Sequence, residues 1–106
     1  MSARRIVIDT LEELVVALCL DYSRRERHIE AHSVSHRTET EYKYLNFKIY
    51  DAAAEICGER YAPIYIEEIG RRIGYAKSRT HLSEVTYKRY KNLIKMNIAR
   101  VLHLID

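Results

Sequence analysis

The fold of this chain is decided by the stretch SEVTYKRYKNLIKMNIARVL, residues 83–102, which predicts one long amphipathic helix. Ser83 is a good N-cap, and Glu84 in the first turn suits the positive end of the helix dipole. Apolar side chains then recur every three or four residues, which places them on one face of a helix running from 84 to about 104. They are Tyr87, Tyr90, Ile94, Ile98, Val101 and Ile105, widened by Leu93 and Leu102.

Two further helices are predicted in the first half of the chain. The hydroxyl of Thr10 with a carboxylate three residues later forms a capping-box pattern, and the apolar period that follows predicts a helix over about 10–31. Residues 33–40 are expected to be the connection. A second capping box, at Thr38, predicts the start of the next helix, and Gly58 is expected to be its C-cap.

A short helix over 64–73 completes the set. Pro63 is well tolerated in a first turn, and Gly74 is expected to end the helix. With only three glycines and one proline the chain has little turn chemistry for a β fold. We therefore predict an all-α, four-helix single domain over 1–106.

Charge divides this domain into two units. Residues 71–100 carry nine Lys/Arg against one acid, whereas residues 1–70 carry nine basic and thirteen acidic residues. The prediction is an acidic N-terminal helical hairpin over 10–58 and a basic unit over 63–104. Clustered cations of this kind favour a polyanionic partner, because they neutralise phosphates and release counterions.

The basic unit has the order of a helix–turn–helix: a short support helix, a glycine, then a helix rich in Thr, Tyr, Lys and Arg. In such units the second helix presents its N-terminal half to base edges in the major groove. The expected DNA-binding residues are Arg71 and Arg72 at the end of the support helix, Lys77, Ser78, Arg79 and Thr80 in the connector, and Thr86, Lys88, Arg89, Lys91 and Lys95 on the last helix.

The connection is longer than the usual three or four residues of this motif, because about eight separate Gly74 from Ser83. Two explanations are open. Either the recognition helix begins earlier, near Ser78, or the turn carries an insertion that itself touches DNA.

The C-terminal part of the chain also resembles a known family. The segments IEEIGRRIGYAKS (66–78), LSEVTYKRYK (82–91) and IARVL (98–102) are similar to phage-encoded late-transcription regulators of the ArpU/RinA kind, which look like region 4 of bacterial sigma factors. The resemblance implies promoter-type DNA binding. It places Thr86, Lys88 and Arg89 in recognition positions, with Tyr87 and Tyr90 holding the helix to its support.

Other chemistry finds little support in the sequence. There is no phosphate loop, nucleophile elbow or HExxH motif, and the paired acids at Glu12 and Glu67 are explained as helix-start residues, so neither an enzyme nor a cofactor is expected. His28, His32 and His36 are spaced by four residues, but the ligand set is incomplete and no metal is predicted.

The two cysteines and the tyrosines are interpreted as packing residues. Cys19 and Cys57 lie among apolar residues and are expected to be reduced, although a disulfide between the first two helices is conceivable. Of the nine tyrosines, Tyr22, Tyr42, Tyr87 and Tyr90 fall on apolar stripes, whereas Tyr44, Tyr50, Tyr61, Tyr65 and Tyr75 are less clearly inside.

The sequence thus predicts a cytoplasmic, sequence-specific double-stranded DNA-binding protein, a transcription regulator with no membrane span. The acidic N-terminal helices are expected to act as a scaffold or to dock RNA polymerase or another protein, and a homodimer is compatible with two-fold sites. The alternative is a non-enzymatic helical module whose basic face docks an acidic partner protein. A third option is binding of RNA or single strands through exposed tyrosines.

Overall fold

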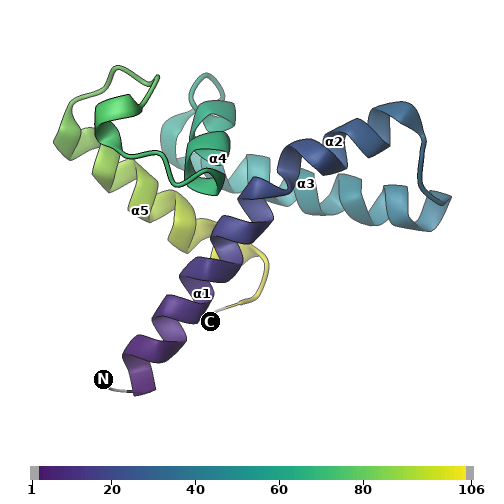
Figure 1. The fold of residues 1–106 in the computed structure, drawn as a ribbon, viewed down its shortest axis with the longest axis horizontal. Coiled ribbons are helices and arrows are strands. Elements are labelled where there is room, and N and C mark those ends of the chain that lie inside the picture. The colour runs from purple at the N-terminus through teal and green to yellow at the C-terminus, as the bar shows by residue number, and fades with distance from the viewer. Residues whose placement is uncertain (1–2, 105–106) are drawn as a thin grey trace.

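The computed structural model describes residues 3–104, and the side chains of residues 10–104. Its described part is all-α, as predicted, with helices and no strands (Figure 1). The elements are α1 (Ala3–Leu20), α2 (Tyr22–Ala31), α3 (His36–Cys57), α4 (Ala62–Gly70), a short 3-10 turn η1 (Tyr75–Lys77) and α5 (Glu84–Val101). No helix among these residues is both long and apolar enough to cross a membrane.

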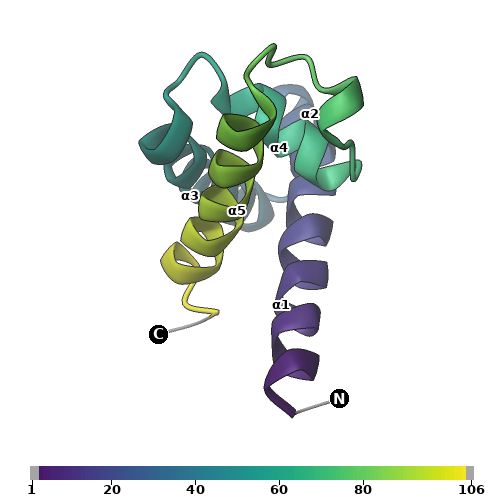
Figure 2. The ribbon, with the colours of Figure 1, turned by 90° about the vertical axis from the view of Figure 1, so that its left-hand side faces the viewer.

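The helices interleave the two halves of the chain around one core. α2 and α3 form an antiparallel hairpin, whereas α1 leaves that hairpin and packs on α4 and α5. α3 in turn packs on α4 and α5. Both ends of the described chain lie at one end of the molecule, and the connection between α4 and α5 lies at the other (Figures 1 and 2).

The first helical segment differs from the prediction at both its start and its middle. The helix already begins at Ala3, so Thr10 lies inside α1 and the predicted capping box there is wrong. The segment also bends at Asp21, which separates α1 from α2. The backbone N–H of Asp21 still donates to Ala17 and its carbonyl still accepts from Arg25, both at 3.1 Å. The period of the sequence therefore continues through the bend and gives no sign of it.

The start of α3 was predicted three residues too late. Ser35, not Thr38, is the N-cap, and its hydroxyl accepts from the backbone N–H of Thr38 at 3.2 Å. At the other end Gly58 is the C-cap as predicted. Its φ of 85° lies in the left-handed region, and its N–H donates to Ala54 at 2.8 Å.

The short helix α4 begins with Pro63 in its first turn as predicted, but it ends at Gly70 instead of residue 73. The left-handed residue beyond it is Arg72, with a φ of 56°, whereas Gly74 has an ordinary φ of −86°, so the prediction that Gly74 ends this helix is wrong. Gly70 has a different role. A Cβ there would lie 2.5 Å from the backbone nitrogen of Leu20, which shows how closely α4 approaches α1.

Helix α5 begins where predicted. The Ser83 hydroxyl accepts from the backbone N–H of Thr86 at 3.3 Å, which confirms the N-cap and excludes a start near Ser78. The helix ends at Val101, earlier than residue 104, and the expected stripe position Ile105 lies outside the described residues.

The predicted apolar stripes supply the core. Ile49, Ile94 and Ile98 are fully buried, as are Ile66 and Ile69. Some positions differ from the prediction. Tyr65, which the sequence left less clearly inside, is fully buried, whereas Leu93 of the predicted stripe is 42% exposed. The two cysteines are free, Cys19 buried and Cys57 half-buried.

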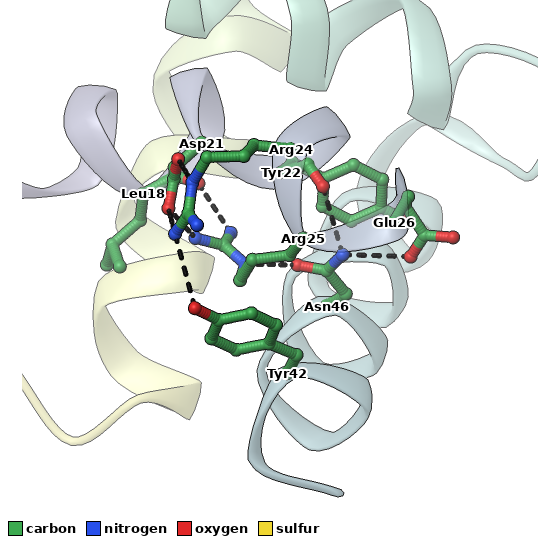
Figure 3. A network of polar contacts seen from close by, with 8 residues as sticks. All are labelled: Leu18, Asp21, Tyr22, Arg24, Arg25, Glu26, Tyr42 and Asn46. Carbon is green, nitrogen blue, oxygen red and sulfur yellow. Dashed lines mark hydrogen bonds and ion pairs between the residues drawn. The ribbon is translucent and has the colours of Figure 1, made fainter. Parts of the chain in front are cut away.

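A buried arginine joins the helical hairpin to α1 (Figure 3). Arg25 lies in the densely charged segment 23–28, yet it is only 2% exposed. Its guanidinium donates to the Asn46 side chain and to the Leu18 carbonyl, each at 2.6 Å, and to Asp21 at 3.2 Å. Because these acceptors lie on α3, on α1 and at the bend, Arg25 holds the three segments together.

Candidate nucleic-acid interface

Most of the predicted DNA-binding residues lie at one end of the molecule, which we call the connector end. It consists of the connector, residues 71–83, and the first turns of α5 (Figures 1 and 2). Lys95 lies further along α5 and is not part of it. The connector is longer than the eight residues expected, because α4 stops early. It is therefore an insertion relative to the short turn of a helix–turn–helix.

A buried carboxylate fixes the connector. Glu68 on α4 is fully buried, and it accepts from the Ser78 hydroxyl at 2.7 Å and from the backbone N–H of Arg79 at 2.8 Å. The Tyr87 hydroxyl donates to the same carboxylate at 3.3 Å. Three donors offset the cost of burying a charge. Glu68 thereby ties α4, the connector and α5 together.

This arrangement changes the role of two predicted site residues. The hydroxyl of Ser78 serves Glu68 and also lies 2.9 Å from that of Thr80, which is only 4% exposed. The Thr80 hydroxyl also accepts from the backbone N–H of Leu82 at 3.5 Å. Both hydroxyls are thus engaged inside the protein and shape the connector, whereas the neighbouring Lys77 and Arg79 are exposed.

Stacked tyrosines attach α5 to its support. The rings of Tyr65 and Tyr87 lie 5.4 Å apart, and the Tyr65 hydroxyl donates to the Tyr87 carbonyl at 3.2 Å. The Tyr87 hydroxyl has a single proton, which it shares between the Glu68 carboxylate and the carbonyl of Ile73, 3.1 Å away. The Tyr90 ring lies edge-on to the Tyr65 ring, with 6.4 Å between the ring centroids. Burial raises the pKa of both Tyr65 and Tyr87, so the two hydroxyls stay protonated and can act as donors.

Most cations of the basic stretch have an acidic partner in the folded chain. Three of the carboxylates involved, Glu12, Glu13 and Glu67, come from the acidic first seventy residues. The pairs are Arg71–Glu67 at 3.6 Å, Arg72–Glu13 at 3.0 Å, Arg79–Glu67, Lys88–Glu84 at 2.7 Å and Lys95–Glu12 at 2.7 Å. The charge asymmetry of the sequence is therefore smaller on the folded surface.

Two exposed cations at the connector end have no carboxylate partner among the described residues. Lys77 lies in η1 and is exposed, and Arg89 is exposed on α5 with its guanidinium 5.7 Å from the centre of the Tyr90 ring. Unpaired, exposed cations are the ones most ready to bind a phosphate or a base edge.

Lys91 and Lys95 do not share this exposure. The Lys91 ammonium donates to the Ile73 carbonyl at 3.0 Å, and burial lowers the pKa of its amine. Lys95 reaches α1, where its hydrogen bond lowers the pKa of Glu12. Their side chains serve contacts within the protein, as does the Thr86 hydroxyl, which accepts from Ser83 at 2.9 Å.

The acidic pairs were misread in the sequence. Glu12 and Glu13 lie in the middle of α1, and Glu67 and Glu68 lie in the second half of α4, so the explanation as helix-start residues is wrong. No local pattern distinguishes the buried Glu68 from the exposed Glu67, because its donors come from ten or more residues further along the chain.

The histidines do not form a ladder. α2 ends at Ala31, and His32 is its left-handed C-cap with a φ of 49°, so the helical spacing is broken. Nδ1 of His32 lies 2.6 Å from Glu39, and Nδ1 of His28 lies 2.6 Å from the hydroxyl of Ser33. Within the described residues no group of three or more His, Cys, Asp or Glu is arranged to hold a metal ion.

Comparison of the chain with protein-family models, curated proteins and solved structures gives no match. The resemblance to the ArpU/RinA kind of regulator therefore stays a prediction from the sequence, and any function has to be argued from the connector end itself.

Proposed function

We propose that this protein is a non-enzymatic, sequence-specific double-stranded DNA-binding protein that regulates transcription and contacts DNA through its connector end. The observation that carries the proposal is the placement of Lys77 and Arg89. These two exposed cations without a carboxylate partner among the described residues lie on the connector and on the first turns of α5. Exposed cations on a loop and an adjoining helix start suit phosphate contact beside a major groove.

The ion-paired cations support the same surface. Arg71, Arg72, Arg79 and Lys88 are exposed although each has a carboxylate partner. Exposed pairs contribute only about 0–1 kcal/mol, so a phosphate can replace the carboxylate at small cost. The carboxylates of these ion pairs would also lower the affinity for polyanions in general. This favours a partner that makes specific contacts in addition to charge pairing.

The hairpin of α2 and α3 projects away from the connector end, and we propose it as the surface for RNA polymerase or another protein partner (Figure 1). Tyr44 and Phe47 on α3 are 59% and 63% exposed. Aromatic side chains are enriched at protein interfaces.

The test is the salt dependence of binding to a random-sequence duplex, measured by fluorescence anisotropy between about 50 and 200 mM salt. Each neutralised phosphate should contribute about 0.9 to the slope of log affinity against log salt. Lys77→Ala should lower that slope by about 0.9. Arg37→Ala removes the same charge from the start of α3 and should leave the slope unchanged. Absence of duplex binding at low salt, or equal losses in both variants, would contradict the proposal.

The second candidate remains a module that docks an acidic protein. It is favoured by the apolar side chains that α5 exposes beside its cations, Leu93 at 42% and Met96 at 62%. An acidic partner that also buries these side chains would keep part of its affinity at high salt, and the chain would then have no affinity for duplex DNA.

A further inference from the structure

The exposed face of the first turns of α5 differs from the face that the sequence suggested. Val85 in the first turn is 78% exposed, more than any other large apolar side chain among the described residues. Arg89 and Asn92 follow four and seven residues later and are also exposed. Residues at this spacing lie on one face of a helix, so the three side chains form a single stripe.

The polar groups of this stripe are not taken up by hydrogen bonds to other described residues, and Asn92 lies at the edge of a groove between α1 and α5 that Leu11 and Glu12 also line. The amide of Asn92 makes no hydrogen bond to another described residue, and Arg89 contacts only the Tyr90 ring there. By contrast the Thr86 hydroxyl accepts a hydrogen bond from the Ser83 hydroxyl, within the protein.

The length of the stripe along the helix matches the length of a few base pairs. Seven residues of α-helix rise about 10.5 Å, which corresponds to about three base pairs at 3.4 Å each. The major groove, about 12 Å wide, admits a helix inserted by its N-terminal turns.

We propose that Val85, Arg89 and Asn92 are the residues that determine sequence specificity, and that they read a thymine, a guanine and an adenine within about three base pairs. The inference rests on the proposed function and adds the bases that the site selects. An apolar side chain can pack on the thymine methyl, a guanidinium can donate twice to guanine O6 and N7, and a carboxamide can pair with adenine N6 and N7. Thr86 and Lys91 then have no part in base selection.

The experiment begins with selection of bound sequences from a random duplex library by the full chain. Arg89→Ala and Asn92→Ala should each lose the preference at one position, with affinity for the selected site falling about 5- to 100-fold. Thr86→Ala is the matched control from the same turn and should keep the whole selected sequence. Urea unfolding of each variant establishes that the fold is retained.

Val85 is tested by removing the methyl group from the DNA. Replacing the selected thymine by uracil should weaken binding of the parent chain about fourfold, the contribution of one buried methyl group. Val85→Ala has a smaller apolar side chain and should discriminate between the thymine and uracil sites less than the parent chain does.

The outcomes separate the two proposals. The assignment of these three residues is wrong if duplex binding depends on salt but selects no sequence, or if the selected sequence survives all three substitutions. In either case the proposal of DNA binding stands. No salt-dependent duplex binding overturns both.

Discussion

The buried guanidinium of Arg25 is expected to contribute far more stability than its exposed neighbour Arg24. Both donate to the carboxylate of Asp21, so the two residues share a partner and differ in burial (Figure 3). Arg25 is 2% exposed and also donates to Asn46 and to the Leu18 carbonyl. Burial lowers the pKa of Arg25, which marks a desolvation cost that these acceptors offset.

Substitution Arg25→Ala leaves the Asn46 side-chain oxygen and the Leu18 carbonyl without their donor inside the protein. Removing one partner of a buried charged network typically costs about 3–5 kcal/mol. A domain of this size has about 5–15 kcal/mol of stability in total, so the loss is a large fraction. With a urea m-value of about 2 kcal/mol per molar, the unfolding midpoint should fall by about 2 M.

The assay is equilibrium urea unfolding followed by circular dichroism. Arg24→Ala is the matched control, and its midpoint should stay close to that of the parent because its side chain is 44% exposed. Arg25→Lys keeps the charge and the aliphatic stem but loses the planar fork, so it should fall between the two. Equal shifts of the urea midpoint for Arg24→Ala and Arg25→Ala would refute the argument that burial increases the contribution of this network to stability.

Two further predictions concern packing and pH. Gly70→Ala should destabilise the protein by about 1–3 kcal/mol, because the new Cβ would lie 2.5 Å from the backbone nitrogen of Leu20. Gly74→Ala places its Cβ where nothing lies within 4 Å, so it should be neutral or slightly stabilising in the same urea assay. Similar losses in both variants would argue against close contact of α1 and α4. Above neutral pH, stability should stay constant up to about pH 9 and fall as the pH rises toward 12. Burial raises the pKa of Cys19 to about 12 and that of Cys57 to about 11. The native chain therefore keeps protons that the unfolded thiols release above their ordinary pKa of 9.0. The decline from Cys19 approaches about 1.4 kcal/mol per pH unit, and urea midpoints that are flat from pH 9 to 10 would contradict it.

The fold class could be predicted because its signals are local. The period of Ile94 and Ile98 and the cap at Ser83 act within a few residues, and each appears in the structure where the sequence places it. The structure of the first helical segment was harder to predict. The bend at Asp21 keeps the backbone hydrogen bonds of a continuous helix, and the Arg25 network that spans the bend depends on Asn46, twenty-one residues away.

The candidate site was predicted only in outline. The sequence located the basic stretch and the start of α5, but it could not separate the cations that face solvent from those that serve the protein. Lys91 and Arg89 are two residues apart, yet one donates to the Ile73 carbonyl and the other is exposed. The difference depends on how α5 is rotated against α4, where Tyr65 stacks on Tyr87.

By itself the sequence determined that the chain is helical, where α5 begins, which faces are apolar, and that positive charge is concentrated in residues 71–100. Only the tertiary structure decided how much of that charge is available. Lys95 pairs with Glu12 across 83 residues and Arg72 with Glu13 across 59, so the acidic first half neutralises part of the basic second half. Helical period and capping are properties of neighbouring residues, whereas these ion pairs exist only because α1 packs against α4 and α5.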